Sequence, residues 1–347
     1  MKKTPLFAAQ GARDATFGEV DGRLVATRFG ALEDETAALR TGAGLLDLSH
    51  AGLVTLVGPD ARRFANGMFT NNIRDLPVGG GNRSAMVDDR ARIQGLLDAY
   101  CTAPDAFLVV LDGVTAEAFE ARYGKYIVFD DVEMTDRSDE LGVLSVQGPQ
   151  AADVLARAGL PIPESVHVAM GDVHVARRDR SGRGGFDVIV PRAALVATWE
   201  GLRGAGAHPA GWDAAEVVRI EAGIPRWPVD MSEKSLLHEL RLVPTCASFA
   251  KGCYIGQEVI NRIDVMGQVT KKIWGLEMAE DALPASGAEV WLDEQNVGST
   301  LSGAREGKRV RVLALLRKAA WTEGATVEVR ADGRTVLATV RDLPFAR

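Results

Sequence analysis

The sequence predicts an α+β protein that ends in a small all-β domain. Up to about residue 240, short β-rich runs alternate with segments of helical periodicity, whereas from about Lys271 β-rich runs alternate with turns. The chain has 347 residues, which at roughly 150 residues per domain corresponds to two or three domains. We therefore expect a mixed α/β part followed by an antiparallel β-barrel or sandwich.

The mixed part shows strand and helix signals in alternation. Apolar residues at helical spacing predict a helix over 31–40, and a glycine pair, Gly42 and Gly44, predicts its end. Asp213 and Glu216 are spaced as in a capping box, which predicts the start of a helix that ends at Gly223. The other expected elements are strands over 53–57, 107–111, 142–147, 173–175 and 186–190, and helices from Asp60, around Phe119 and Tyr123, after Gly148-Pro149, over 195–202 and from Gln257.

The C-terminal part contains four short β-rich runs and a hairpin signal. Asp332-Gly333 lies between the last two runs, and this dipeptide is typical of a tight turn between antiparallel strands. The expected strands are 273–276, 310–316, 326–329 and 336–340.

Composition limits the function classes. Lys and Arg total 40 and Asp and Glu total 47, so the net charge of −7 argues against a general nucleic-acid binder. Three cysteines form no disulfide framework, which favours a reducing compartment. No stretch approaches the roughly 20 apolar residues of a membrane span, and five dispersed histidines show no zinc spacing. We expect a cytoplasmic protein with no nucleic-acid partner, no membrane partner and no metal site.

The most unusual stretch is Lys-Gly-Cys-Tyr-Ile-Gly-Gln-Glu over 251–258. A thiol at Cys253, close to an expected helix start and beside Lys251, favours the thiolate, because both neighbours place positive potential near the sulfur. Cys253 is then a reactive or metal-contacting thiol. From the residues alone, a small buried residue in a tight turn is favoured over this, because free cysteines are often simply buried. Cys246, seven positions earlier, leaves a cysteine pair or a cluster site as a weaker alternative.

Charged residues supply further candidates. Arg219 lies in a largely apolar helix, where its guanidinium can hold a ligand carboxylate in a bidentate fork. The alternative is an internal salt bridge with Glu221 or Asp230. Asp98 and several other aspartates near strand ends are candidates for a general acid or base.

Residues 251–258 resemble the signature of the YgfZ-type folate-binding proteins, which are relatives of the glycine-cleavage T-protein, an aminomethyltransferase. Three further segments agree in order: Gly-Leu-Leu-Asp-Leu-Ser-His at 44–50, Val-Gln-Gly-Pro-Gln-Ala at 146–151 and Arg-Ile-Glu-Ala-Gly-Ile-Pro at 219–225. The resemblance covers nearly the whole chain. It implies an aminomethyltransferase-like folate-binding fold, in which two mixed lobes surround a central hole and a C-terminal antiparallel β-barrel completes the ring.

The resemblance also implies domain boundaries. Residues 1–49 and 135–245 would form a discontinuous first folate-binding lobe, and 50–134 would form the second. Residues 246–270 would be the signature loop and linker, and 271–347 the barrel.

The resemblance assigns roles to four residues. Arg219 matches the arginine that faces the glutamate tail of folate, and Asp187 stands where the T-protein has a glutamate that binds the pterin. Lys251 belongs to the signature and is expected to contribute to the folate site. Cys253 matches the cysteine on which the function of the YgfZ branch depends, so it is the expected catalytic residue.

Two departures from the T-protein pattern matter. Gly95 occupies the position of the catalytic aspartate, and Asp98 is the nearest carboxylate that is able to replace it. Ser181-Gly182-Arg183 replaces Thr-Gly-Glu. Without the aspartate, aminomethyl transfer loses a group that orients and stabilises charge at the reacting amine.

Three hypotheses for function follow. The first is a tetrahydrofolate-binding protein, or one that binds another reduced folate, which supports iron–sulfur cluster assembly or repair with iron–sulfur proteins as partners. The second is a folate-dependent one-carbon transferase, an aminomethyltransferase or demethylase. The third is a scaffold that retains the fold and binds no folate.

Overall fold

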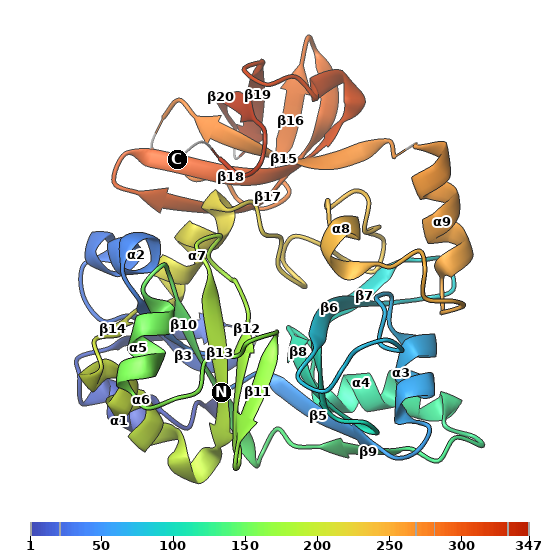
Figure 1. Cartoon of the computed structure of the whole chain (residues 1–347). Coiled ribbons are helices and arrows are strands. Elements are labelled where there is room, and N and C mark those ends of the chain that lie inside the picture. The colour runs from blue at the N-terminus through green and yellow to red at the C-terminus, as the bar shows by residue number, and fades with distance from the viewer. Residues whose placement is uncertain (1, 21, 268, 281, 332, 346–347) are drawn as a thin grey trace.

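The computed structural model describes residues 2–345 except residues 21, 268, 281 and 332. Figure 1 shows two mixed α/β lobes side by side and a β-barrel above them. The barrel is closed, and its strand order is β15-β18-β17-β16-β19-β20. The predicted fold class, a mixed α/β part with two lobes and a C-terminal antiparallel barrel, is therefore confirmed.

The first lobe is built on a six-stranded sheet in the order β11-β12-β13-β10-β4-β14. Its central strand β10 is buried along its whole length, because helices cover one face and the second lobe covers the other (Figure 1). The strands are β4 (Gly44–Asp47), β10 (Leu141–Gln147), β11 (His167–Met170), β12 (Val173–Arg177), β13 (Gly185–Pro191) and β14 (His208–Pro209). A small sheet beside it has the order β1-β3-β2, with β1 (Lys2–Lys3), β2 (Thr16–Val20) and β3 (Arg23–Arg28).

Helices on the first lobe bury apolar faces against this sheet. Trp199 and Leu202 of α6 are almost fully buried in the same cluster as the sheet residues Val146 and Val188. The helices are α1 (Phe7–Gly11), α2 (Leu32–Thr41), α5 (Ala151–Arg157), η2 (Arg192–Ala194), α6 (Leu195–Gly204) and α7 (Trp212–Glu221).

The second lobe is formed by one continuous stretch of chain and has a five-stranded sheet in the order β6-β7-β8-β5-β9. Phe69, Phe119 and Tyr123 pack as an aromatic cluster between its helices and the sheet. The elements are β5 (Gly52–Val57), α3 (Ala61–Met68), β6 (Gly81–Val87), β7 (Ile93–Ala103), β8 (Ala106–Asp112), α4 (Ala116–Tyr123), η1 (Gly124–Tyr126) and β9 (Glu133–Asp136).

A connecting segment and the barrel complete the chain. Helices α8 (Val243–Cys246) and α9 (Gln257–Met266) lie between the second lobe and the barrel (Figure 1). The barrel elements are β15 (Lys271–Met278), β16 (Glu289–Leu292), β17 (Gln295–Glu306), β18 (Arg309–Arg317), η3 (Lys318–Ala320), β19 (Thr326–Ala331) and β20 (Arg334–Arg341).

Ion pairs attach the barrel to the first lobe. Glu306 of the barrel bonds Arg40 through both carboxylate oxygens at 2.8 Å, and Arg311 bonds Glu221 at 2.5 Å. Arg40 also donates to Glu221 at 2.9 Å, so the four side chains form one chain of charges. Because these groups are largely buried, removing one partner leaves an unpaired charge at the interface.

The expected capping box is wrong. Helix α7 begins at Trp212, its N-cap is Gly211 and no side chain caps it. Asp213 instead accepts a hydrogen bond from Arg28 at 2.7 Å, and Glu216 binds Arg219. The expected hairpin residue Asp332 lies outside the described residues, although the flanking strands β19 and β20 do pair antiparallel. Among the described residues, no helix is long and apolar enough to cross a membrane.

Candidate functional site

A cavity of about 360 Å³ lies between the two lobes. Its walls combine two tryptophan rings, Trp212 and Trp227, with a mixture of charged side chains. The lining cations are Lys2, Arg23, Arg178, Arg180, Arg192, Arg219 and Arg226, and the lining acids are Asp112, Glu117, Asp136, Asp139 and Glu216. Cationic side chains therefore exceed acidic ones in this wall, although the chain as a whole carries a net charge of −7.

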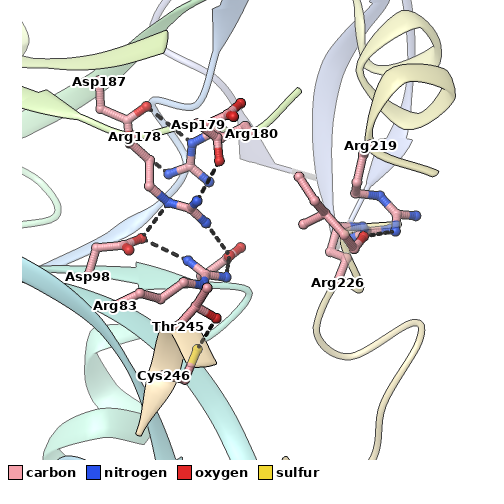
Figure 2. A network of polar contacts seen from close by, with 12 residues as sticks. Arg83, Asp98, Arg178, Asp179, Arg180, Asp187, Arg219, Arg226, Thr245 and Cys246 are labelled. Carbon is pink, nitrogen blue, oxygen red and sulfur yellow. Dashed lines mark hydrogen bonds and ion pairs between the residues drawn. The ribbon is translucent and has the colours of Figure 1, made fainter. Parts of the chain in front are cut away.

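Behind one wall, a cluster of charges joins the two lobes (Figure 2). Asp98 of β7 accepts from Arg83 of β6 at 2.9 Å and from Arg178 of the first lobe at 3.0 Å. Arg83 also donates to Asp112, at the end of β8, at 2.5 Å. This cluster is formed by three arginines and three aspartates when the pair Arg180–Asp187 is included.

The two aspartates on the second lobe differ in access to the cavity. Asp98 is 3% exposed and does not line the cavity, whereas Asp112 does. Burial acts to raise the pKa of Asp112, but the guanidinium groups of Arg83, Arg180 and Arg178 hold that pKa well below its usual range. Asp112 is therefore an ionised carboxylate in the cavity wall.

Arg219 lies in the cavity wall and is saturated by partners of its own chain. Its Nε and Nη2 donate to the two carboxylate oxygens of Glu216 at 2.9 and 2.5 Å, and its Nη1 donates to Asp230 at 2.7 Å. Ser302 of the barrel and the carbonyl of Ile224 accept the remaining hydrogen bonds. The structure thus contains the internal salt bridge to Asp230, whereas Glu221 pairs elsewhere. The role of Arg219 toward a folate tail stays a prediction.

Asp187 is fully buried on β13 and does not line the cavity. Its Oδ1 accepts from Ser145 at 2.7 Å, and Arg180 donates to both of its oxygens, at 3.1 and 2.7 Å. Arg180 does line the cavity, so it stands between this carboxylate and the space that a ligand would take (Figure 2). The role of Asp187 toward the pterin stays a prediction.

Lys251 anchors the signature loop to the second lobe. Its buried ammonium group donates to the carbonyl of Asn66 at 2.5 Å and to that of Phe69, at the C-terminal end of α3, and lies 4.4 Å from the ring of Tyr254. Burial, with a smaller effect of the Arg74 charge, lowers the pKa of Lys251 to about 7. Lys251 does not line the cavity, so a contribution to folate binding stays a prediction.

Cys253 is exposed, and Cys101 and Cys246 are buried. The thiol of Cys253 lies on the loop held by Lys251, just before α9, and outside the lining of the cavity. Within the described residues, no group of three or more His, Cys, Asp or Glu side chains is placed to hold a metal ion. The interpretation of Cys253 as a small buried residue is therefore wrong, and its chemical role stays a prediction.

Position 95 has no room for a side chain. Gly95 of β7 has a φ of +153°, and a Cβ there would overlap a methyl group of Val114 and lie 3.2 Å from the sulfur of Met86. Val114 itself lines the cavity. Its side chain thus fills the space that a carboxylate at position 95 would need.

Sequence reasoning missed Asp112, Arg178 and Arg180. Asp112 ends an apolar strand, where an aspartate is commonly a turn residue, and nothing in the sequence relates it to Gly95. A signal was present for the arginines, because four of the seven residues from 177 to 183 are arginine.

Comparisons with known proteins place the chain in a family. Residues 6–248 match the GCVT N-terminal domain, and residues 271–346 match the glycine cleavage T-protein C-terminal barrel domain. The chain belongs to the GCVT family. The aminomethyltransferases of this family use tetrahydrofolate, and a folate cofactor is consistent with membership.

Curated relatives are similar over their full length. Aminomethyltransferases from Herpetosiphon aurantiacus and a Geobacillus species are each 29% identical to the chain, over 99% of the chain and 98% of the relative. The chain is also similar to the crystal structure of the glycine cleavage system aminomethyltransferase T from Bartonella henselae. The match covers 99% of this chain and 98% of the Bartonella chain, with a TM-score of 0.90 and 24% sequence identity. The last comparison supports the fold.

The cavity residues fit a folate. Trp227 and Trp212, the latter with Arg226 over its ring, give the lining aromatic surface that suits flat heteroaromatic and benzoyl rings. Lys2 and Arg23 are neighbours across β1 and β3, and with Arg192 they line the cavity as cations that suit the carboxylates of a glutamate tail. Arg219 is less suited to that task, because its donors are already engaged.

Proposed function

We propose that the cavity binds tetrahydrofolate or another reduced folate, and that the protein is of the YgfZ type. In this proposal it supports assembly or repair of iron–sulfur clusters, with Cys253 as the functional thiol and proteins that carry four-iron clusters as partners. Two features support this proposal. The thiol of Cys253 is exposed and therefore accessible to a partner protein, and the cavity lining has aromatic and cationic side chains that suit a folate.

Gly95 is the reason for preferring this proposal to one-carbon transfer. A carboxylate at this position would overlap Val114, and the replacement suggested by the sequence, Asp98, is engaged by two arginines. Both arginines donate to the same oxygen of Asp98, and its side chain does not line the cavity, so it is poorly placed to reach a bound substrate. In this proposal the chain keeps a cavity for folate, whereas the position that matches the catalytic aspartate of the T-protein has no room for a carboxylate.

The test uses a strain that lacks the protein. We would restore the wild type, Cys253→Ser or Cys246→Ala and assay aconitase, a four-iron enzyme, beside a cluster-free enzyme and the abundance of each variant. Cys246→Ala is the matched control, because it removes a buried thiol from the same segment. The proposal expects aconitase activity to be restored by the wild type and by Cys246→Ala and not by Cys253→Ser. Equal rescue by all three would contradict the role of the thiol.

Aminomethyl transfer or demethylation is the second candidate, and the full-length similarity to relatives named aminomethyltransferase favours it over cluster assembly. Incubating the purified chain with tetrahydrofolate and a small amine donor tests it. A one-carbon folate product at catalytic turnover would support transfer, and its loss in Asp98→Asn would assign the carboxylate. Absence of any product would favour the first proposal.

A further inference from the structure

We infer that Asp112 is the carboxylate that orients a bound folate, by accepting hydrogen bonds from the N–H groups of its pterin ring. The inference rests on the proposed folate binding and adds a specificity-determining residue to it. Sequence comparison assigned this kind of contact to Asp187, whose two oxygens are occupied by Ser145 and Arg180 behind the cavity wall.

The first observation is the state of the Asp112 carboxylate. Oδ2 is held by Arg83 at 2.5 Å, with Arg178 at 3.8 Å. Oδ1 receives no hydrogen bond or ion pair from any residue that the structure describes. The side chain lines the cavity and is 20% exposed. On a carboxylate whose other oxygen is fixed by an arginine, an ionised oxygen without a hydrogen-bond donor is a strong acceptor for a ligand N–H.

The second observation is that the other acids of the cavity lining are poorer candidates. Glu216 gives both oxygens to Arg219 and also pairs with Arg226. Glu117, Asp136 and Asp139 are exposed to water, where a hydrogen bond to a ligand exchanges with solvent and adds little affinity. Asp112 is therefore the acid that combines partial burial with an unengaged oxygen.

The third observation is an aromatic ring beside the residue that follows Asp112. Gly113, the following residue, lies so close to Trp227 that a Cβ there would be 2.5 Å from the Trp227 carbonyl oxygen and 3.1 Å from Cδ1 of its indole ring. Trp227 and Asp112 both line the cavity, so a flat ligand ring packed on the indole lies in the same cavity as this carboxylate. The amino and ring N–H groups of a pterin are donors on the edge of its ring, and a carboxylate is the complementary acceptor.

The register of the sheet explains the placement. Asp112 on β8 is the partner of Leu96 on β7, next to Gly95. The carboxylate in the cavity wall therefore comes from β8, whereas the T-protein pattern has its catalytic aspartate at position 95, on the neighbouring strand β7. Asp112 orients the ligand and moves no proton, because its arginine neighbours keep it ionised.

The test is calorimetric titration of the full-length chain with tetrahydrofolate under reducing conditions. Asp112→Asn is compared with Asp98→Asn, the matched control. Each variant removes one negative charge from the same cluster and leaves Arg83 one aspartate, but Asp98 does not line the cavity. Thermal unfolding of both variants measures how far each substitution lowers the stability of the fold, so that a loss of stability is not mistaken for a loss of binding.

We expect Asp112→Asn to weaken tetrahydrofolate binding about tenfold or more, the usual effect of losing a hydrogen bond to a charged group. Asp98→Asn should bind within about twofold of the wild type. Equal weakening in both variants, or wild-type affinity in Asp112→Asn, would overturn the role of Asp112. A wild-type chain that binds no tetrahydrofolate would overturn the proposed folate site itself, a separate result.

Discussion

Substituting Gly95 with alanine tests whether position 95 excludes a side chain. The new Cβ would overlap Val114 and press on Met86, and overpacking of this kind costs about 1–3 kcal/mol. The φ of +153° adds a strained backbone, at about 1–3 kcal/mol. We therefore expect Gly95→Ala to lower the free energy of unfolding by about 2–6 kcal/mol.

Urea unfolding of four proteins separates the two contributions: the wild type, Gly95→Ala, Val114→Ala and the double variant. Shortening Val114 makes room for the new methyl group, so Gly95→Ala should cost about 1–3 kcal/mol less in the Val114→Ala background. The backbone contribution should remain in both backgrounds. A Gly95→Ala chain as stable as the wild type, or costs that simply add, would refute the claim that Val114 fills this space.

Three further predictions concern the residues singled out by the sequence. Arg219→Ala should destabilise the chain by about 3–5 kcal/mol, because Glu216 and Asp230 lose their partner. Urea unfolding measures this loss of stability. Unchanged stability together with a loss of folate affinity would contradict the prediction. For Lys251, with a pKa near 7 in the folded chain, the unfolded chain binds more protons between about pH 7 and 10.4, so this group makes stability rise with pH in that window. The unfolding free energy of the wild type should therefore rise by roughly 2 kcal/mol more than that of Lys251→Met between pH 7 and 9. Urea unfolding at several pH values measures this, and the same pH dependence in both proteins would contradict it. Cys253→Ser should leave the melting temperature unchanged, since this thiol is exposed; a drop of several degrees would mean that it has a structural role.

Periodicity located the elements whose apolar pattern is uninterrupted. Strand β10 and helix α2 lie within a residue or so of the expected positions, and the change of pattern near Lys271 coincides with the first barrel strand. Strand β7 was missed, although it is the longest strand of the second lobe at 11 residues. Gln94, Gly95 and Asp98 interrupt its apolar run, and those interruptions face partners on other elements that no local pattern reveals.

The candidate site shows the same limit. The signature drew attention to Lys251 and Cys253, and the structure places both away from the cavity lining. The state of a charged residue depends on neighbours distant in sequence: Arg178 reaches Asp98 across 80 positions. A sequence read locally identifies an arginine or an aspartate, whereas its partners decide whether it has a donor or acceptor left for a ligand. The domain boundaries that the resemblance implies remain proposals.

The order in which the chain leaves the ribosome bears on when the cavity can form. Its lining begins at Lys2 and ends at Trp227, and both lobes contribute to it. A nascent chain that has released the second lobe still lacks Arg178, Arg180 and the tryptophan rings. Ligand capture must therefore wait until about two thirds of the protein has been made. The barrel, which emerges last, adds no lining residue and attaches to the first lobe through Arg40 and Glu306, while its Ser302 accepts from the lining residue Arg219.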